Sequence, residues 1–139
     1  MEFRTGEPSV EIAIVIPYDF PAESNPSIRQ EILGFLAGII ADEEVREFLP
    51  TFLSLNMEGR NCHQMAVILT GVGSNGKGVL KNLMEETFGP YHNEPSAHFL
   101  TSETLSDESP CPNLVRLKAK TSVFMSEPEQ GRKFNGPFL

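Results

Sequence analysis

The stretch GVGSNGK, residues 71–77, lies between an apolar run and an amphipathic segment, and it limits the possible folds of this chain more than any other feature. The preceding run, 65–69, is short and continuously apolar, which is typical of a strand buried on both faces of a sheet. After the loop, apolar side chains recur at helical spacing until Gly89-Pro90, which predicts the helix end. The order of strand, glycine-rich loop and helix predicts an α/β fold with parallel strands.

The loop itself fits the phosphate-binding pattern GxxxxGK at every fixed position. Its glycines allow positive φ and close approach of the backbone, so that N–H groups can surround an anion at the positive end of a helix. Lys77 adds a compact charge for the β- and γ-phosphates of ATP. The alternative is a glycine-rich turn with a solvated lysine. The candidate cofactor-binding residues are Gly71, Gly73, Ser74, Asn75, Gly76, Lys77 and Gly78.

The second half of an ATP site is expected to be an acidic residue at the end of a neighbouring strand. Residues 121–125 have the composition of a short buried strand, which ends at Ser126-Glu127. A carboxylate there can orient water or help to hold the shell of Mg²⁺, so Glu127 is the candidate catalytic residue. Glu129 is the weaker candidate, and two solvated acids after a strand are the alternative interpretation.

Upstream of the loop, the sequence predicts one strand and two helices. Residues 10–18 are rich in isoleucine and valine, which favours a strand. Asn25-Pro26 offers a helix cap followed by proline at the first helical position, and Asp42 opens the acidic first turn of a second helix. Pro50 lies inside that second helix and is expected to kink or divide it.

We expect an N-terminal strand and helical segment over 1–61 and a truncated ATPase core over 62–139. The net charge of −8 argues that DNA-gripping surface, which needs clustered lysine and arginine, lies elsewhere. No apolar run approaches the roughly 20 residues that span a membrane, so no membrane contact is expected. Cys62 and Cys111 are too few for a disulfide scaffold and favour reduced thiols in an intracellular protein.

The longer string GVGSNGKGVLKNLMEETFGPY resembles the superfamily 3 helicase ATPases, and most closely the primase-helicases of large DNA viruses and phages. The family pattern is G-x-G-x-N-G-K-S, then a helix, then G-x-Y. Residues 18–61 look like the helical segment that precedes the ATPase, and NLVRLKAKTSVFMSEPEQGRKFN resembles the segment that carries the family's acid. The resemblance covers most of residues 17–135.

The resemblance implies an AAA+-like P-loop domain in which Lys77 contacts nucleotide phosphates and Asn75 shapes the cradle. Glu127 would be the acidic residue of the family's motif B, at the end of the second strand. The cofactors implied are ATP and Mg²⁺, and the implied role is viral or phage DNA replication inside the host cell. The implied partners in a full-length protein are single-stranded or forked DNA and further copies of the chain, which form ring hexamers in the family.

Two departures from the family pattern qualify this expectation. Gly78 stands where the family has the hydroxyl residue that binds Mg²⁺, so ATP hydrolysis is expected to be impaired. Residue 139 precedes any counterpart of the family's sensor strand, DNA-contacting hairpin and arginine finger. The sequence therefore looks like a fragment that binds ATP weakly and hydrolyses it slowly or not at all alone.

Two other functions are compatible with the residues. A P-loop small-molecule kinase would share the loop, but the chain has no arginine-rich lid. A non-enzymatic interaction module would use the helical segment at 26–56, with a vestigial loop behind it. Nucleotide binding distinguishes the loop-based functions from the module.

Overall fold

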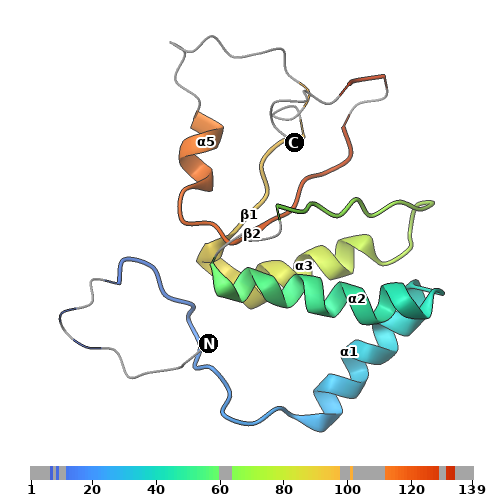
Figure 1. Ribbon diagram of the computed structural model, residues 1–139, viewed down its shortest axis with the longest axis horizontal. Helices are drawn as coiled ribbons and strands as arrows, with labels where there is room; N and C mark the ends of the chain where they lie inside the picture. The colour runs from blue at the N-terminus through green and yellow to red at the C-terminus, as the bar shows by residue number, and fades with distance from the viewer. Residues whose placement is uncertain are drawn as a thin grey trace.

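The computed structural model describes residues 7, 9, 12–59, 64–97, 101, 112–128 and 131–133. Figure 1 shows α1, α2 and α3 gathered together, with α5 apart from them beyond two short strands. The elements in chain order are α1 (Pro26–Ile39), α2 (Glu43–Ser54), the 3₁₀ helix η1 (Leu55–Glu58), α3 (Lys77–Phe88), the 3₁₀ helix η2 (Gly89–Tyr91), β1 (His92–Asn93), α5 (Pro112–Leu117) and β2 (Ser122–Val123).

The first helix begins where the sequence predicts. The Asn25 side chain accepts a hydrogen bond from the Ser27 N–H at 3.0 Å and a second from the Ile28 N–H, which satisfies donors that have no partner inside the helix. Pro26 occupies the first helical position, where its missing N–H costs nothing. The predicted cap and start of α1 are therefore confirmed.

The second helix also begins as predicted, but Pro50 does not divide it. Asp42 caps α2 by accepting from the Val45 N–H at 3.1 Å, and the helix then runs without a break from Glu43 to Ser54. Proline lacks the N–H that would donate to the Arg46 carbonyl, so the helix loses one hydrogen bond at this position and still continues through it. Leu49, beside the proline, is buried in the core, so packing holds the helix together across this position.

One buried leucine from each of the three long helices forms the core. Leu36 of α1, Leu49 of α2 and Leu80 of α3 pack together, and burying each one contributes about 1.5–3 kcal/mol. The partly buried apolar residues around them are Ile32, Phe35, Ile39, Ile40, Leu53 and Leu69. The core contains residues from both of the expected segments, 1–61 and 62–139. The boundary between these two segments stays a prediction.

The two strands form a small parallel sheet. His92 pairs with Ser122 and Asn93 with Val123, and the Phe124 N–H extends the ladder to the Asn93 carbonyl at 3.1 Å. The parallel arrangement agrees with an α/β class. The strand expected over 121–125 is confirmed only over β2. Its partner β1 forms in a segment where the sequence predicted no strand.

The strand expected over 65–69 does not form. This segment is extended but outside the sheet, and the Ile68 side chain is 75% exposed. A strand that is buried on both faces needs a neighbouring strand to pair with and other elements to cover it. The sheet of the described residues contains only β1 and β2, paired over two residues each, and does not include 65–69. Leu69 alone in this run packs against the leucine core.

Residues 12–18 also form no strand, and a bend lies at Pro17-Tyr18, while Val10 and Glu11 lie outside the described residues. Two tyrosine hydroxyl groups attach this segment to the end of α3 and to η2. The Tyr91 hydroxyl donates to the Ile14 carbonyl at 2.6 Å, and the Tyr18 hydroxyl donates to the Thr87 carbonyl. The strand expected over 10–18 therefore does not form in the described part of this segment, which is held by tyrosine hydroxyl groups instead.

A buried histidine joins the two strands. His92 is 8% exposed, and its Nδ1 shares a hydrogen bond of 3.0 Å with the hydroxyl of Ser122, which is fully buried. The His92 Nε2 is buried without a hydrogen-bond partner among the described residues. Burial lowers the pKa of His92 below 6.5, because the charged imidazolium would lose its hydration, and the negative charges of Glu85 and Glu94 oppose this shift only in part.

The chain is expected to lose stability as the pH falls below about 6.5. The pKa of His92 is lower in the folded chain than in the unfolded chain, so the unfolded state binds the extra proton first. Neutral His92 makes its full contribution to the free energy of unfolding above about pH 6.5. Below that pH the contribution declines toward the folded-state pKa, with a slope approaching about 1.4 kcal/mol per pH unit. Urea unfolding at pH 7.5 and 5.5 measures this loss. His92→Gln, which cannot titrate, should show a smaller loss, and equal losses in both chains would contradict the assignment.

Candidate phosphate-binding loop

Residues 71–76 connect the extended segment to the N-terminus of α3. The predicted helix is confirmed over Lys77–Phe88, and Gly89 ends it at φ +45° with its N–H donating to the Glu85 carbonyl. Lys77 is the first helical residue. The loop therefore lies at the positive end of a helix of 12 residues.

The backbone conformation of the loop corrects one detail of the sequence analysis. Gly71 and Gly76 adopt φ values of +151° and +84°, as expected. Gly73 does not have positive φ, and Ser74 adopts +60° in its place. Serine in the left-handed region is uncommon, so Ser74 is held there by the conformation of the loop around it.

Two nitrogen donors gather over Gly71. The Lys77 Nζ donates to the Gly71 carbonyl at 3.1 Å, which closes the loop on itself. A Cβ added to Gly71 would lie 2.2 Å from the Asn75 Nδ2 and 3.7 Å from the Lys77 Nζ. The side-chain amide and the ammonium group therefore converge on one point that only glycine leaves open.

The backbone N–H groups of the loop are not used inside the described part of the protein. Among the described residues, no N–H of residues 71–76 donates a hydrogen bond to a protein acceptor. Backbone donors at such a turn normally have partners in the protein, in solvent or in a ligand. Together with Asn75 and Lys77, these groups form a concentration of donors suited to a polyphosphate.

The loop rests on the C-terminal end of α1. A Cβ added to Gly76 would lie 2.6 Å from the Ile39 Cγ2 and 3.4 Å from the Phe35 Cε2. Such a contact is too short for any β-carbon, so Gly76 allows the loop backbone to approach the helix closely. The glycine of the GK pair thus has a packing role as well as a conformational one.

The structure does not bond Glu127 to the loop. Glu127 is exposed on the extended segment that follows β2, and among the described residues it makes no hydrogen bond or ion pair. Glu129, the weaker candidate, lies outside the described residues, as do Cys62 and Cys111. Gly78 is exposed in the first turn of α3, where an added Cβ would meet no heavy atom within 4 Å.

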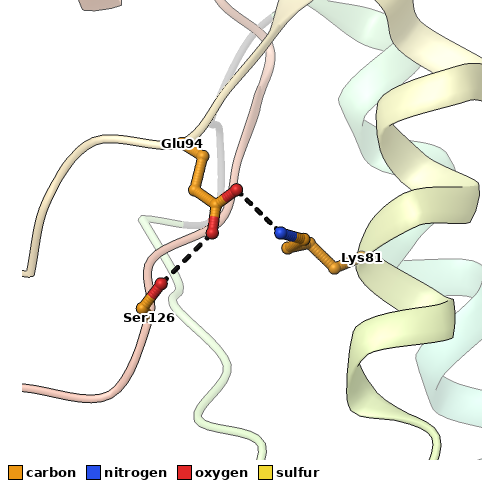
Figure 2. Close-up of polar contacts among 3 residues, drawn as sticks. All are labelled: Lys81, Glu94 and Ser126. Carbon is orange, nitrogen blue, oxygen red and sulfur yellow. Dashed lines mark hydrogen bonds and ion pairs between the residues drawn. The ribbon is translucent and has the colours of Figure 1, made fainter.

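Sequence reasoning missed a polar bridge beside the loop helix, which Figure 2 shows. The Glu94 carboxylate accepts from the Lys81 Nζ at 2.8 Å and from the Ser126 hydroxyl at 3.1 Å. The hydrogen bond from Lys81 is the main cause that lowers the pKa of Glu94, and the same bond raises the pKa of Lys81. An acidic residue at the end of a strand is the signal that predicted Glu127. The same signal could not find Glu94, because β1 is only two residues long and has no strand pattern in the sequence.

The part of the chain that the structure describes holds no cluster of acidic, histidine or cysteine side chains that would mark a preformed metal site. Those residues contain no group of three or more histidine, cysteine, aspartate or glutamate side chains placed to hold a metal. Mg²⁺ commonly takes one or two carboxylates and completes its shell with phosphates and water. A metal that arrives with a nucleotide therefore remains compatible with the loop.

Comparison with curated proteins relates the chain to large DNA viruses. "Putative helicase L207/L206" of Acanthamoeba polyphaga mimivirus is 30% identical over 138 residues, which are 99% of this chain and 14% of that protein. "Putative helicase 121R" of Invertebrate iridescent virus 3 is 28% identical over 120 residues, covering 85% of this chain and 13% of the relative. "Putative helicase 184R" of Invertebrate iridescent virus 6 is 37% identical over 93 residues, covering 63% and 9%.

These relatives are viral helicases by name. The similarity supports a helicase relationship for the chain, which spans only 14% or less of the length of these three relatives. No protein-family profile matches the chain, and no solved structure matches it. Among the described residues, no helix has both the length and the apolar character to cross a lipid bilayer.

Proposed function

We propose that the chain is an ATP-binding segment of a DNA helicase that acts in the replication of a viral genome, of the superfamily 3 primase-helicase type. One observation carries the proposal. The Asn75 amide and the Lys77 ammonium converge over Gly71 at the start of α3, in a chain whose relatives are named as helicases of large DNA viruses.

The chemistry of the loop suits the polyphosphate tail of a nucleotide. Phosphate oxygens carry negative charge and accept several hydrogen bonds, and the loop offers backbone N–H groups, an amide and an ammonium group at a helix N-terminus. Among the described residues, the Lys77 Nζ bonds only to a neutral carbonyl, at 3.1 Å, so an incoming phosphate is a stronger partner for it. Mg²⁺ would accompany the nucleotide and neutralise part of its charge.

Other parts of the function belong to the whole protein. Glu127 is proposed to orient water or the metal shell next to the bound nucleotide. Single-stranded or forked DNA would be gripped largely outside this chain, whose net charge is −8. The whole protein is proposed to assemble into a homo-oligomer, a hexamer as in the family. It is proposed to act on replicating DNA inside the infected cell.

A nucleotide titration tests the proposal directly. The intact chain is titrated with a fluorescent ATP analogue, with Mg²⁺ and with EDTA. Saturable binding that unlabelled ATP displaces is the expected result. Absence of binding at every concentration would contradict the proposal and would support the interaction module.

The interaction module has one structural observation in its favour. Leu33 of α1 and Val45 and Phe48 of α2 are each more than 40% exposed, although they are large and apolar. Exposed apolar side chains on adjacent helices are suited to contact with another protein surface. Absence of nucleotide binding in the titration would therefore leave this surface as the feature that favours an interaction module.

Replacing Gly78 with serine is expected to raise magnesium-dependent ATP hydrolysis. A side chain fits at this position without a clash and supplies the hydroxyl group that P-loops direct to Mg²⁺. Phosphate release in Mg²⁺ and in EDTA measures the effect. Gly78→Ala is the matched control, because it adds the β-carbon without the hydroxyl. Equal turnover in the wild type and both variants would contradict the assigned role of the missing hydroxyl.

A further inference from the structure

The bridge around Glu94 connects the two halves of the proposed nucleotide site. Lys81 lies one helical turn after Lys77 on α3, and Ser126 directly precedes Glu127 in the segment after β2. Glu94 contacts both, with one carboxylate oxygen on each partner. In Figure 2 the carboxylate lies between the helix and the extended segment, and both partners point toward it.

The position of the bridge in the sheet strengthens this connection. Glu94 comes directly after β1, and Ser126 lies three residues after β2, so both lie beyond the carboxyl ends of parallel strands. Ligands in open α/β sheets bind at that edge. Since the sheet ladder ends at the bond from the Phe124 N–H to the Asn93 carbonyl, side chains must position the segment beyond it.

We propose that Glu94 is a positioning residue of the nucleotide site, which holds the Ser126-Glu127 segment at a fixed place relative to α3 and thereby relative to Lys77. This inference rests on the proposed ATP-binding function. Glu94 itself touches neither nucleotide nor metal. Its effect passes through Ser126 to the adjacent Glu127, whose own exposed side chain makes no hydrogen bond or ion pair with another described residue.

The size of the expected effect follows from the exposure of the bridge. The side chains of Lys81 and Glu94 are 33% and 34% exposed, so solvent screens their attraction. Pairs of this kind change an equilibrium by a factor of about two to five. Mg²⁺ is expected to raise the affinity for the nucleotide, and this gain depends on the position of Glu127. Loss of the bridge should therefore reduce the gain by the same factor.

The test is a double-mutant cycle on the intact chain. The affinity for a fluorescent ATP analogue is measured in Mg²⁺ and in EDTA for the wild type, Glu94→Ala, Glu127→Gln and the double variant. We expect Glu94→Ala to lower the magnesium-dependent gain by about two- to fivefold and to leave the affinity in EDTA unchanged. In the Glu127→Gln background, Glu94→Ala should have no further effect, because the residue through which it acts is already disabled.

Three further variants separate positioning from general stability. Ser126→Ala removes one contact and keeps the ion pair, and it should lower the magnesium-dependent gain in the same direction. Glu94→Gln keeps an oxygen acceptor for Ser126 and should recover part of the gain. Glu86→Ala removes an exposed acid of α3 with the same change in net charge, and it should behave like the wild type. Thermal unfolding confirms that each variant is folded.

The outcomes distinguish this inference from the function on which it rests. Binding by the wild type with an unchanged magnesium-dependent gain in Glu94→Ala would overturn the inference and leave ATP binding intact. Additive effects of Glu94→Ala and Glu127→Gln, or no magnesium-dependent gain in the wild type, would also overturn it. Absence of any nucleotide binding by the wild type would overturn both.

Discussion

Replacing Lys77 with alanine is expected to weaken ATP binding roughly tenfold to a hundredfold. Charged hydrogen bonds contribute about 1.5–3 kcal/mol each, and 1.4 kcal/mol corresponds to one factor of ten in affinity. The Lys77 ammonium is the charged donor that lies over the loop, and its one hydrogen bond among the described residues is to the neutral Gly71 carbonyl. Titration of the variant with a fluorescent ATP analogue measures the loss.

The fold should survive this substitution, so the result can be interpreted as a change in binding. Lys77 takes no part in the leucine core, and alanine is the most favourable residue in a helix. Lys118→Ala is the matched control, because it removes an exposed lysine outside the loop with the same change in net charge. If Lys77→Ala and Lys118→Ala bind the analogue as tightly as the wild type does, the loop is not the nucleotide site.

Replacing Gly76 with alanine should destabilise the fold by about 1–3 kcal/mol from backbone strain alone. The residue has φ +84°, a conformation that alanine adopts at a cost. The new Cβ would also lie 2.6 Å from the Ile39 Cγ2, and that methyl group is attached directly at the β-carbon and cannot swing away freely. Urea denaturation of the variant and the wild type measures the difference.

Gly73 provides the control within the same loop. It has no positive φ, and an added Cβ would meet no heavy atom within 4 Å. Gly73→Ala should therefore unfold at nearly the same urea concentration as the wild type. Equal destabilisation by both substitutions would show that loop glycines matter through general flexibility and not through the contact between Gly76 and α1.

The helices were predictable because their signals act over a few residues. Asn25 and Asp42 bond to N–H groups two or three positions away, and Gly89 ends α3 through its own backbone conformation. Strands need partners that a local pattern does not identify. The run 65–69 has the composition of a buried strand but pairs with no strand among the described residues, while β1 lies in a segment without any strand pattern.

The candidate site was predictable in part for the same reason. The motif located the loop and the helix start at Lys77, because the spacing of glycine and lysine is itself local. The positive φ of Ser74 was not predictable, since serine adopts it only under the constraint of its neighbours. Glu94 was missed because its partners, Lys81 and Ser126, lie 13 and 32 residues away in the chain.

The two tyrosine hydroxyl groups also determine how the N-terminal segment can detach. Residues 12–18 bond to the rest of the described structure through side-chain hydroxyls and without a backbone ladder. Each such bond contributes about 0.5–1.5 kcal/mol, and Ile12 and Val15 are more than half exposed. Local unfolding of this segment therefore requires far less free energy than global unfolding, and it would uncover the C-terminal end of α3 while the three-leucine core stays intact.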